Sequence, residues 1–198
     1  MAHISGRTLQ RLDNPRDVII TEQLYHRPNS DAGERKVAAL SRLANELTGT
    51  PAEILHCLMA EAMTLCNADT VGLSVLRKDD QGEHFFWQDM AGHLGEHVGG
   101  RTPREWSPCG TTLNSGRPEL FLLPGRVFHY FLDVDPQIYE GLVVPVEVDD
   151  KYVATVWVVH HDDRKKFILS DVDAMTSLAS FTGAAISHMN GKADQASA

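Results

Sequence analysis

The sequence lacks most features that mark membrane proteins and disulfide-stabilised proteins. It has three cysteines, Cys57, Cys66 and Cys109, with no C-x-x-C pair among them. Three cysteines cannot form a closed set of disulfides, so we expect reduced thiols. The apolar runs are far shorter than the roughly 20 residues of a transmembrane helix. No apolar stretch follows the N-terminal charges, as it would in a secretory signal. We therefore expect a cytoplasmic protein that does not span the membrane.

Basic residues and catalytic motifs are also scarce. The 18 Lys and Arg are outnumbered by 27 Asp and Glu, which gives a formal net charge of -9. Nucleic-acid binding depends on clustered basic side chains, so a nucleic-acid partner is not expected. The chain contains no phosphate-binding glycine loop and no Ser-His-Asp order, so we expect no catalytic apparatus. His93 and His97 have helical spacing but no third ligand nearby, so no metal site is predicted, and no cofactor is indicated.

The pattern of apolar residues predicts helices, two hairpins and an irregular insertion. Helices are expected over residues 35–47, 51–65 and 170–189, the last with Ser170 as its N-cap. Alternating residues predict one hairpin from strands 70–77 and 84–90, and a second from 138–148 and 152–161. Between the hairpins, residues 91–104 are irregular and rich in glycine, and Ser107-Pro108 begins a short helix.

This order of elements predicts one α+β domain. Strands flanked by helices at both ends of the chain indicate an antiparallel sheet, with the terminal helices on one face. The insertion then lies over the other face, where a pocket can form. We assign residues 34–190 to this domain, residues 1–33 to a flexible or loosely docked N-terminal arm, and residues 191–198 to a disordered tail.

Three segments of the chain are similar to a known family. They are residues 106–121, residues 139–146 together with 154–160, and residues 167–181. In these segments the chain resembles the GAF domains found in bacterial sensor histidine kinases and other signalling proteins. The resemblance extends over roughly residues 37–188. It implies a GAF-like antiparallel sheet, N- and C-terminal helices packed on one face that often dimerise, a ligand-type pocket on the other face, and a sensory role in signal transduction.

Aromatic and basic residues gather in the strands and the insertion, where they form a candidate ligand pocket. Aromatic side chains could line an apolar pocket, with Arg101, Arg104, Arg126 and His129 as polar anchors for an anionic or planar ligand. A core filled by the same aromatics is the alternative. The candidate site comprises Trp87, Arg101, Arg104, Cys109, Phe121, Phe128, His129, Tyr130, Tyr139 and Trp157.

Cys109 leaves two further readings open. In the first turn of a helix its thiol would lie where the helix dipole favours a thiolate, which suits a redox or cofactor-attachment role. Alternatively, Cys109-Gly110 is a small pair needed for close packing. The expected function is a stand-alone sensory domain that binds a small molecule or a signalling protein, as a homodimer through helices 35–47 and 170–189. The alternatives are a thiol-dependent reductase centred on Cys109 and a ligand-free dimerisation scaffold.

Overall fold

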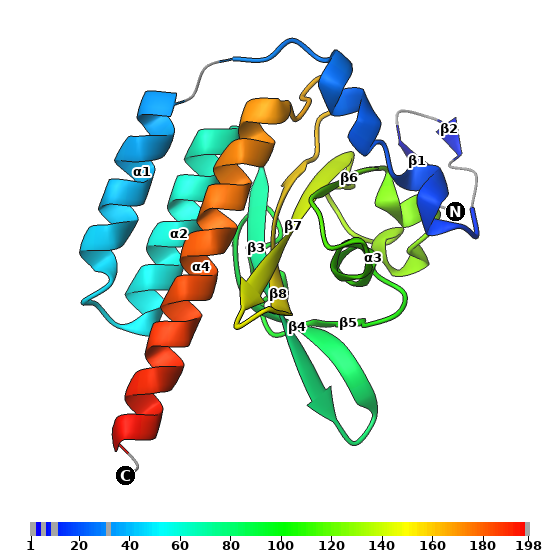
Figure 1. Cartoon of the computed structure of the whole chain (residues 1–198). Helices are drawn as coiled ribbons and strands as arrows, with labels where there is room; N and C mark the ends of the chain where they lie inside the picture. Colours follow the sequence, from blue (N-terminus) through cyan, green and yellow to red (C-terminus); the bar gives the residue numbers. More distant parts are fainter. Residues whose placement is uncertain (1–2, 5–6, 9–11, 31–32, 197–198) are drawn as a thin grey trace.

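The centre of the fold is a six-stranded antiparallel sheet (Figure 1). The computed structural model describes residues 3–4, 7–8, 12–30 and 33–196. In the order β5-β4-β3-β8-β7-β6, every neighbouring pair of strands in the sheet is antiparallel. Its strands are β3 (Thr70–Asp79), β4 (Gly82–Gly92), β5 (Arg101–Pro103), β6 (Glu119–Leu122), β7 (Glu140–Val148) and β8 (Lys151–His160). Two short strands, β1 (His3–Ile4) and β2 (Arg7–Thr8), pair separately.

Both hairpins expected from the sequence are present in the sheet. Strands β3 and β4 join through the two-residue turn Asp80-Gln81, and Gly82, the first residue of β4, has a φ of 109° that suits a residue without Cβ. Strands β7 and β8 join through Asp149 and Asp150, with φ values of 49° and 60°. Two left-handed residues in a two-residue loop match the twist of the flanking strands, and Asp tolerates this conformation better than most residues. The two polar turns in the sequence thus correctly predict which of the four central strands pair as hairpins.

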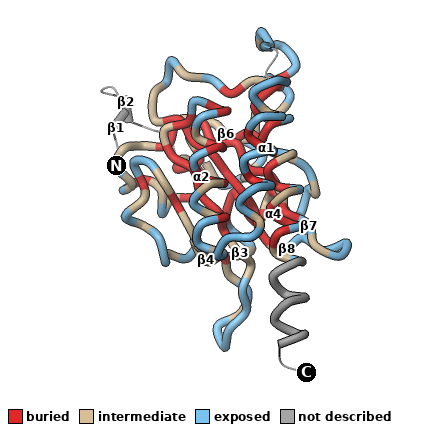
Figure 2. Tube along the Cα trace, turned by 90° about the vertical axis from the view of Figure 1, so that its left-hand side faces the viewer, coloured by how far each residue is buried: buried red, intermediate tan, exposed pale blue. Residues whose placement is uncertain are grey.

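Three helices cover one face of the sheet: α1 (Gly33–Glu46), α2 (Pro51–Cys66) and α4 (Leu169–Ala196) (Figure 1). Helix α2 begins with a capping box in which Thr50 and Glu53 satisfy each other's backbone amides. The core between helices and sheet includes Leu58, Val156 and Leu178, all almost fully buried. Figure 2 shows that burial is concentrated in the sheet and on the inner sides of the helices.

The opposite face carries irregular chain and one short helix, α3 (Pro108–Ser115). Five short 3-10 turns accompany the helices, namely η1 (Pro15–Val18), η2 (Thr21–His26), η3 (Gly95–His97), η4 (Pro124–Arg126) and η5 (His129–Phe131). A second core lies between this layer and the sheet and includes Phe85, Phe121 and Phe128. The predicted α+β class, with helices on one face and the insertion on the other, is confirmed.

The described part of the N-terminal segment, which was expected to be flexible or loosely docked, packs on the domain. Within residues 12–30, Val18 and Leu24 are buried in the two cores. The backbone amide of Ile20 donates to the carbonyl of Leu120, at 2.7 Å. Residues 1–2, 5–6, 9–11 and 31–32, which the expectation also included, lie outside the described residues. The described part of the segment 12–30 is therefore packed along strand β6.

Helix α4 begins and ends differently from the prediction. Its first residue is Leu169, so Ser170 lies in the first turn and is not the cap. The side chain of Asp171, the third residue of the helix, accepts a hydrogen bond from the amide of Ile168, the residue before the helix (2.8 Å). The helix continues to Ala196 and so includes most of the expected tail, whose residues 197–198 are not described. It extends beyond the ends of α1 and α2 in Figure 1.

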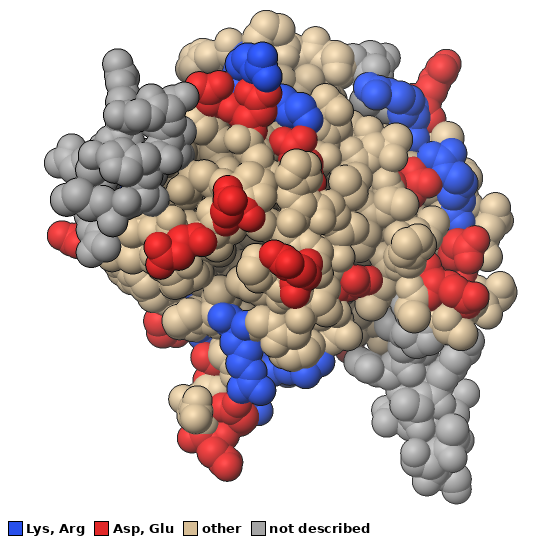
Figure 3. Space-filling model, turned by 180° about the vertical axis from the view of Figure 1, so that it is seen from behind, with Lys and Arg blue, Asp and Glu red and all other residues tan. Residues whose placement is uncertain are grey.

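Charged and apolar surfaces are mixed over the described part of the chain. In the view of Figure 3 most Lys and Arg side chains stand near Asp and Glu. Among the described helices, none has the length and hydropathy needed to span a bilayer.

Candidate functional site

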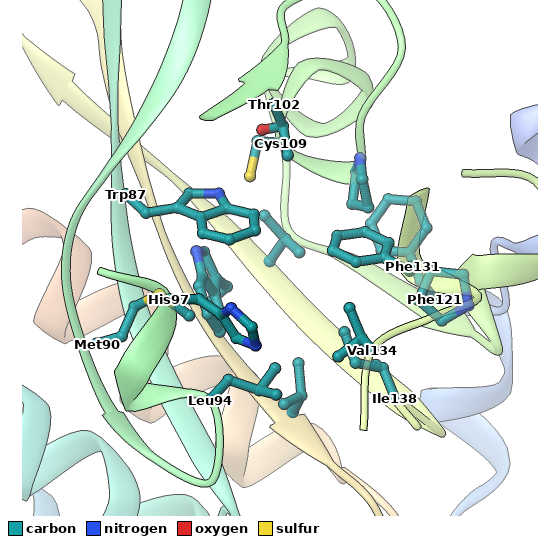
Figure 4. A pocket seen from close by; sticks show the side chains of 16 residues that line it. Trp87, Met90, Leu94, His97, Thr102, Cys109, Phe121, Phe131, Val134 and Ile138 are labelled. Carbon is teal, nitrogen blue, oxygen red and sulfur yellow. The ribbon is translucent and has the colours of Figure 1, made fainter. Parts of the chain in front are cut away.

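A small apolar pocket lies between the sheet and the layer that contains α3 (Figure 4). Its volume of about 50 Å³ is well below the roughly 300–1,000 Å³ of typical pockets for drug-sized ligands. The walls come from strands β4 to β8, helix α3 and the turns η3 to η5. They comprise Trp87, Met90, Leu94, His97, Thr102, Pro108, Cys109, Phe121, Pro124, Phe131, Val134, Ile138, Gly141, Val143, Trp157 and Val159. None of these side chains is acidic, and none is a Lys or Arg.

Two tryptophans form much of the sheet side of the pocket. The ring of Trp157 packs over Gly72 of the neighbouring strand, and a Cβ at Gly72 would meet that ring at 2.2 Å. The indole Nε1 of Trp157 donates to Ser74 Oγ at 2.8 Å, which fixes the orientation of the ring. Trp87 meets His97 edge to face, with ring centroids 6.4 Å apart. The absence of a side chain at Gly72 therefore makes room for Trp157 in the pocket wall.

Helix α3 presents Cys109 to the pocket. Ser107 caps this helix by accepting a hydrogen bond from the Gly110 amide, as the sequence predicted. The Cys109 thiol is buried, and burial raises its pKa, although the neighbouring Thr155 and Ser74 hydroxyls oppose the rise. The expected thiolate is thus disfavoured at neutral pH. Cys57 and Cys66 belong to α2 on the opposite face of the sheet, so neither lies beside Cys109 to resolve a disulfide.

The basic residues proposed as ligand anchors are engaged elsewhere. Arg101 donates to the carboxylate of Asp79 at 2.9 Å, on an exposed surface of the first hairpin. Arg104 donates to the carbonyl of Gly110 and to Asn114 Oδ1, and so braces α3. The Nε2 of His129 lies 3.2 Å from the Arg126 carbonyl. None of these four side chains belongs to the pocket wall.

Three of the candidate aromatics also lie outside the pocket. Phe128 is fully buried behind it, in edge contacts with Trp106 and Phe121. The hydroxyl of Tyr130 donates to the Trp106 carbonyl at 3.3 Å. The Tyr139 ring packs against the ammonium of Lys166, 4.3 Å from the ring centroid. Of the ten candidates, the structure therefore brings together Trp87, Cys109, Phe121 and Trp157.

Sequence reasoning missed most of the pocket wall. Leu94, His97 and Thr102 come from the irregular segment, where no periodicity indicates which side chains point inward. Val159 could have been found, because it lies two residues from Trp157 on the same strand and so faces the same side of the sheet. The other missed wall residues are small or apolar, and nothing in their sequence pattern distinguishes a pocket wall from an ordinary core.

The histidines form contacts of other kinds. His93 stacks on His161 with ring centroids 5.3 Å apart, and His160 stacks on Phe167 at 4.0 Å. Burial is the main cause that lowers the pKa of His160 to about 4, so this side chain is neutral at pH 7. Across the described ranges, no three His, Cys, Asp or Glu residues are grouped as they would be to hold a metal ion.

The antiparallel sheet, with helices on one face and a small pocket under loops on the other, places the chain in a class of α+β domains. Residues 50–186 match the family model described as GAF domain, and the chain belongs to the GAF domain family. The predicted resemblance is thus confirmed. GAF domains are known for sensory and signalling ligand binding. A search of curated proteins found no match.

Solved structures of GAF domains share the fold at low sequence identity. The GAF domain of a phosphoenolpyruvate-protein phosphotransferase from Coxiella burnetii is 16% identical with a TM-score of 0.68, covering 83% of this chain and 99% of that one. A phycoerythrobilin-bound GAF domain from a cyanobacterial phytochrome is 13% identical with a TM-score of 0.66, covering 81% and 98%. The free methionine-R-sulfoxide reductase from Neisseria meningitidis, in complex with its substrate, is 15% identical with a TM-score of 0.61, covering 82% and 96%. Identities this low establish the fold alone.

Proposed function

We propose that this chain is a sensory module that binds a small molecule in the pocket and relays its presence to the helical layer. The observation that carries the proposal is the position of strand β8 between the two cores. Trp157 of this strand lines the pocket, whereas its neighbours Val156 and Val158 are buried against the helices. A ligand that moves Trp157 therefore acts on a strand that also contacts the helical layer.

The small size of the cavity favours one competing function. A pocket of about 50 Å³ is nearly filled by its own side chains, which suits a scaffold that binds no ligand. A reductase centred on Cys109 has less support, because the thiol is buried, its pKa is raised and no second cysteine lies beside it. We therefore propose a non-enzymatic role.

Native mass spectrometry and an absorption spectrum of freshly purified protein would test the sensory role. The intact mass is compared with the 21.9 kDa of the chain. We expect additional mass from a retained small molecule, lost on denaturation if it is held non-covalently. A protein that shows the chain mass alone, and that no small molecule stabilises in a thermal-shift screen, would support the scaffold instead.

We further propose that the module is a homodimer that associates through α1. The apolar stripe of α4 that sequence reasoning assigned to the dimer includes Leu178, which is fully buried against the sheet. Substituting Leu178 would therefore test folding and not dimerisation. On α1, by contrast, the Val37 side chain is 62% exposed, and Leu40 is only partly buried. An exposed apolar strip of this kind suits a helix-mediated contact.

Replacing Val37 with aspartate is expected to convert the dimer to a monomer in light scattering, because a carboxylate is costly to bury at an apolar contact. Val98→Asp is the matched control, since Val98 is 47% exposed and lies near turn η3 on the other side of the sheet. Dimers of equal stability in both variants would exclude α1 as the contact.

A further inference from the structure

The pocket wall holds one polar group without a partner. Thr102 is 3% exposed, and its hydroxyl has no hydrogen-bond partner within the described part of the chain. Strand β5 places this residue opposite Phe85 of strand β4. In Figure 4 the Thr102 oxygen lies at the same end of the pocket as the Cys109 sulfur. An unsatisfied buried hydroxyl costs free energy, so its persistence at a cavity points to a partner that a ligand supplies.

Two other polar groups near this end of the pocket already have partners. The Trp157 indole nitrogen donates to Ser74, and the Arg104 guanidinium donates to Gly110 and Asn114. The Cys109 thiol is a weak donor and acceptor beside Thr102. Thr102 supplies the hydroxyl of the pocket wall, and the Trp87 indole and the His97 imidazole are its other polar side-chain groups.

Apart from His97, the lining offers no side chain that would pair with a charged ligand. The wall contains no Lys, Arg, Asp or Glu, and Arg101 is paired with Asp79 on the surface. A charge buried without an opposite charge is strongly unfavourable. The remaining wall is aromatic and aliphatic, and such surfaces favour apolar ligands.

From these contacts we infer that the pocket takes a small, uncharged, largely apolar molecule whose single hydrogen-bonding group meets the Thr102 hydroxyl. This inference rests on the proposed ligand-binding function. Because the cavity measures about 50 Å³, a ring-sized ligand must displace a wall side chain. His97 is the first candidate, since it belongs to the three-residue turn η3 and is only partly buried.

Titrations with three ring compounds of similar size test the inference. Phenol carries a hydroxyl, benzene carries no polar group and benzoate carries a charge. Binding is followed by NMR through the indole N–H signals of Trp87 and Trp157, assigned with Trp→Phe variants. We expect phenol to bind about tenfold more tightly than benzene, the value of one neutral hydrogen bond. We expect benzoate to bind at least a hundredfold more weakly than phenol.

Three substitutions locate the hydrogen bond. Thr102→Val replaces the hydroxyl with a methyl group and should remove the tenfold preference for phenol, whereas Thr102→Ser should retain it. Thr112→Val is the matched control, because the Thr112 hydroxyl is also buried and unpartnered among the described residues but does not line the pocket. It should leave the preference unchanged.

The outcomes separate this inference from the proposed function. If benzene and phenol bind equally to the wild type, or if Thr102→Val keeps the preference, the role of Thr102 is overturned while the pocket still binds ligands. Tight benzoate binding would overturn the uncharged class. If none of the three compounds shifts either indole signal, the inference is overturned, whereas the small-molecule sensing function fails only if native mass spectrometry and the thermal-shift screen also find no ligand.

Discussion

Gly110→Ala is expected to lower the free energy of unfolding by about 3 kcal/mol, the upper part of the range for overpacked sites. A Cβ on Gly110 would lie 1.8 Å from the backbone oxygen of Arg104. The Arg104 side chain holds the same helix start through hydrogen bonds to Gly110 and Asn114, so neither backbone can move away freely. Chemical denaturation measures the loss.

The same substitution should also alter the pocket. Helix α3 would have to shift as a unit, and Cys109 is the residue immediately before Gly110. Gly95→Ala is the matched control, because the nearest atom to its added Cβ is the Met90 oxygen at 3.7 Å, an ordinary contact. If both variants unfold at the same denaturant concentration, the close approach of α3 to Arg104 is incorrect.

The second large loss of stability is expected on substitution of Glu140, an acidic residue buried at the start of β7. Its carboxylate accepts two hydrogen bonds from Arg27, at 2.8 and 2.9 Å, and one from the amide of Phe167. Lys166 adds an ion pair at 3.2 Å. Glu140→Ala leaves Arg27, which is mostly buried, without this partner, so we expect the free energy of unfolding to fall by about 3–5 kcal/mol.

Urea denaturation measures this loss, and limited proteolysis tests its location. Arg27 ends the segment that packs along β6, so Glu140→Ala should expose residues 12–30 to cleavage before the rest of the domain. Asp162→Ala is the control, because its pair with Arg164 lies at the surface and should contribute little to stability. Equal losses in the two variants would contradict the role assigned to the buried pair.

Short sequence patterns predicted the order of helices and hairpins in the fold. The Thr50-Pro51-Glu53 start of α2 and the Asp149-Asp150 turn were readable, because caps and tight turns depend on residues close in sequence. The start of α4 was not, because Ser170 is a good capping residue by type, whereas the helix begins one residue earlier at Leu169. Which side of α4 faces its own sheet could not be predicted from periodicity, since an apolar stripe looks the same in either case.

Long-range contacts account for the remaining errors. Val18 begins the short apolar run Val18-Ile19-Ile20 and Leu24 follows three polar residues, so neither forms part of a periodic pattern. Their burial depends on strand β6, about 100 residues later. Arg101 was a reasonable ligand anchor, but it forms an ion pair with Asp79 of the first hairpin. The aromatic residues were correctly expected near the second core, whereas their division into pocket wall and filled core depends on side-chain direction, which the sequence does not encode locally.

The segment along β6 also has a consequence for association between chains. A sheet edge presents unpaired amides and carbonyls, and a second chain can add a strand to it. Here Leu120 exchanges hydrogen bonds with Ile20 and Thr21, and Ile19 forms an isolated bridge with Phe121. The other edge strand, β5, has three residues. The N-terminal segment thereby serves as edge protection, and its attachment through Arg27 and Glu140 helps to keep the sheet from templating aggregation.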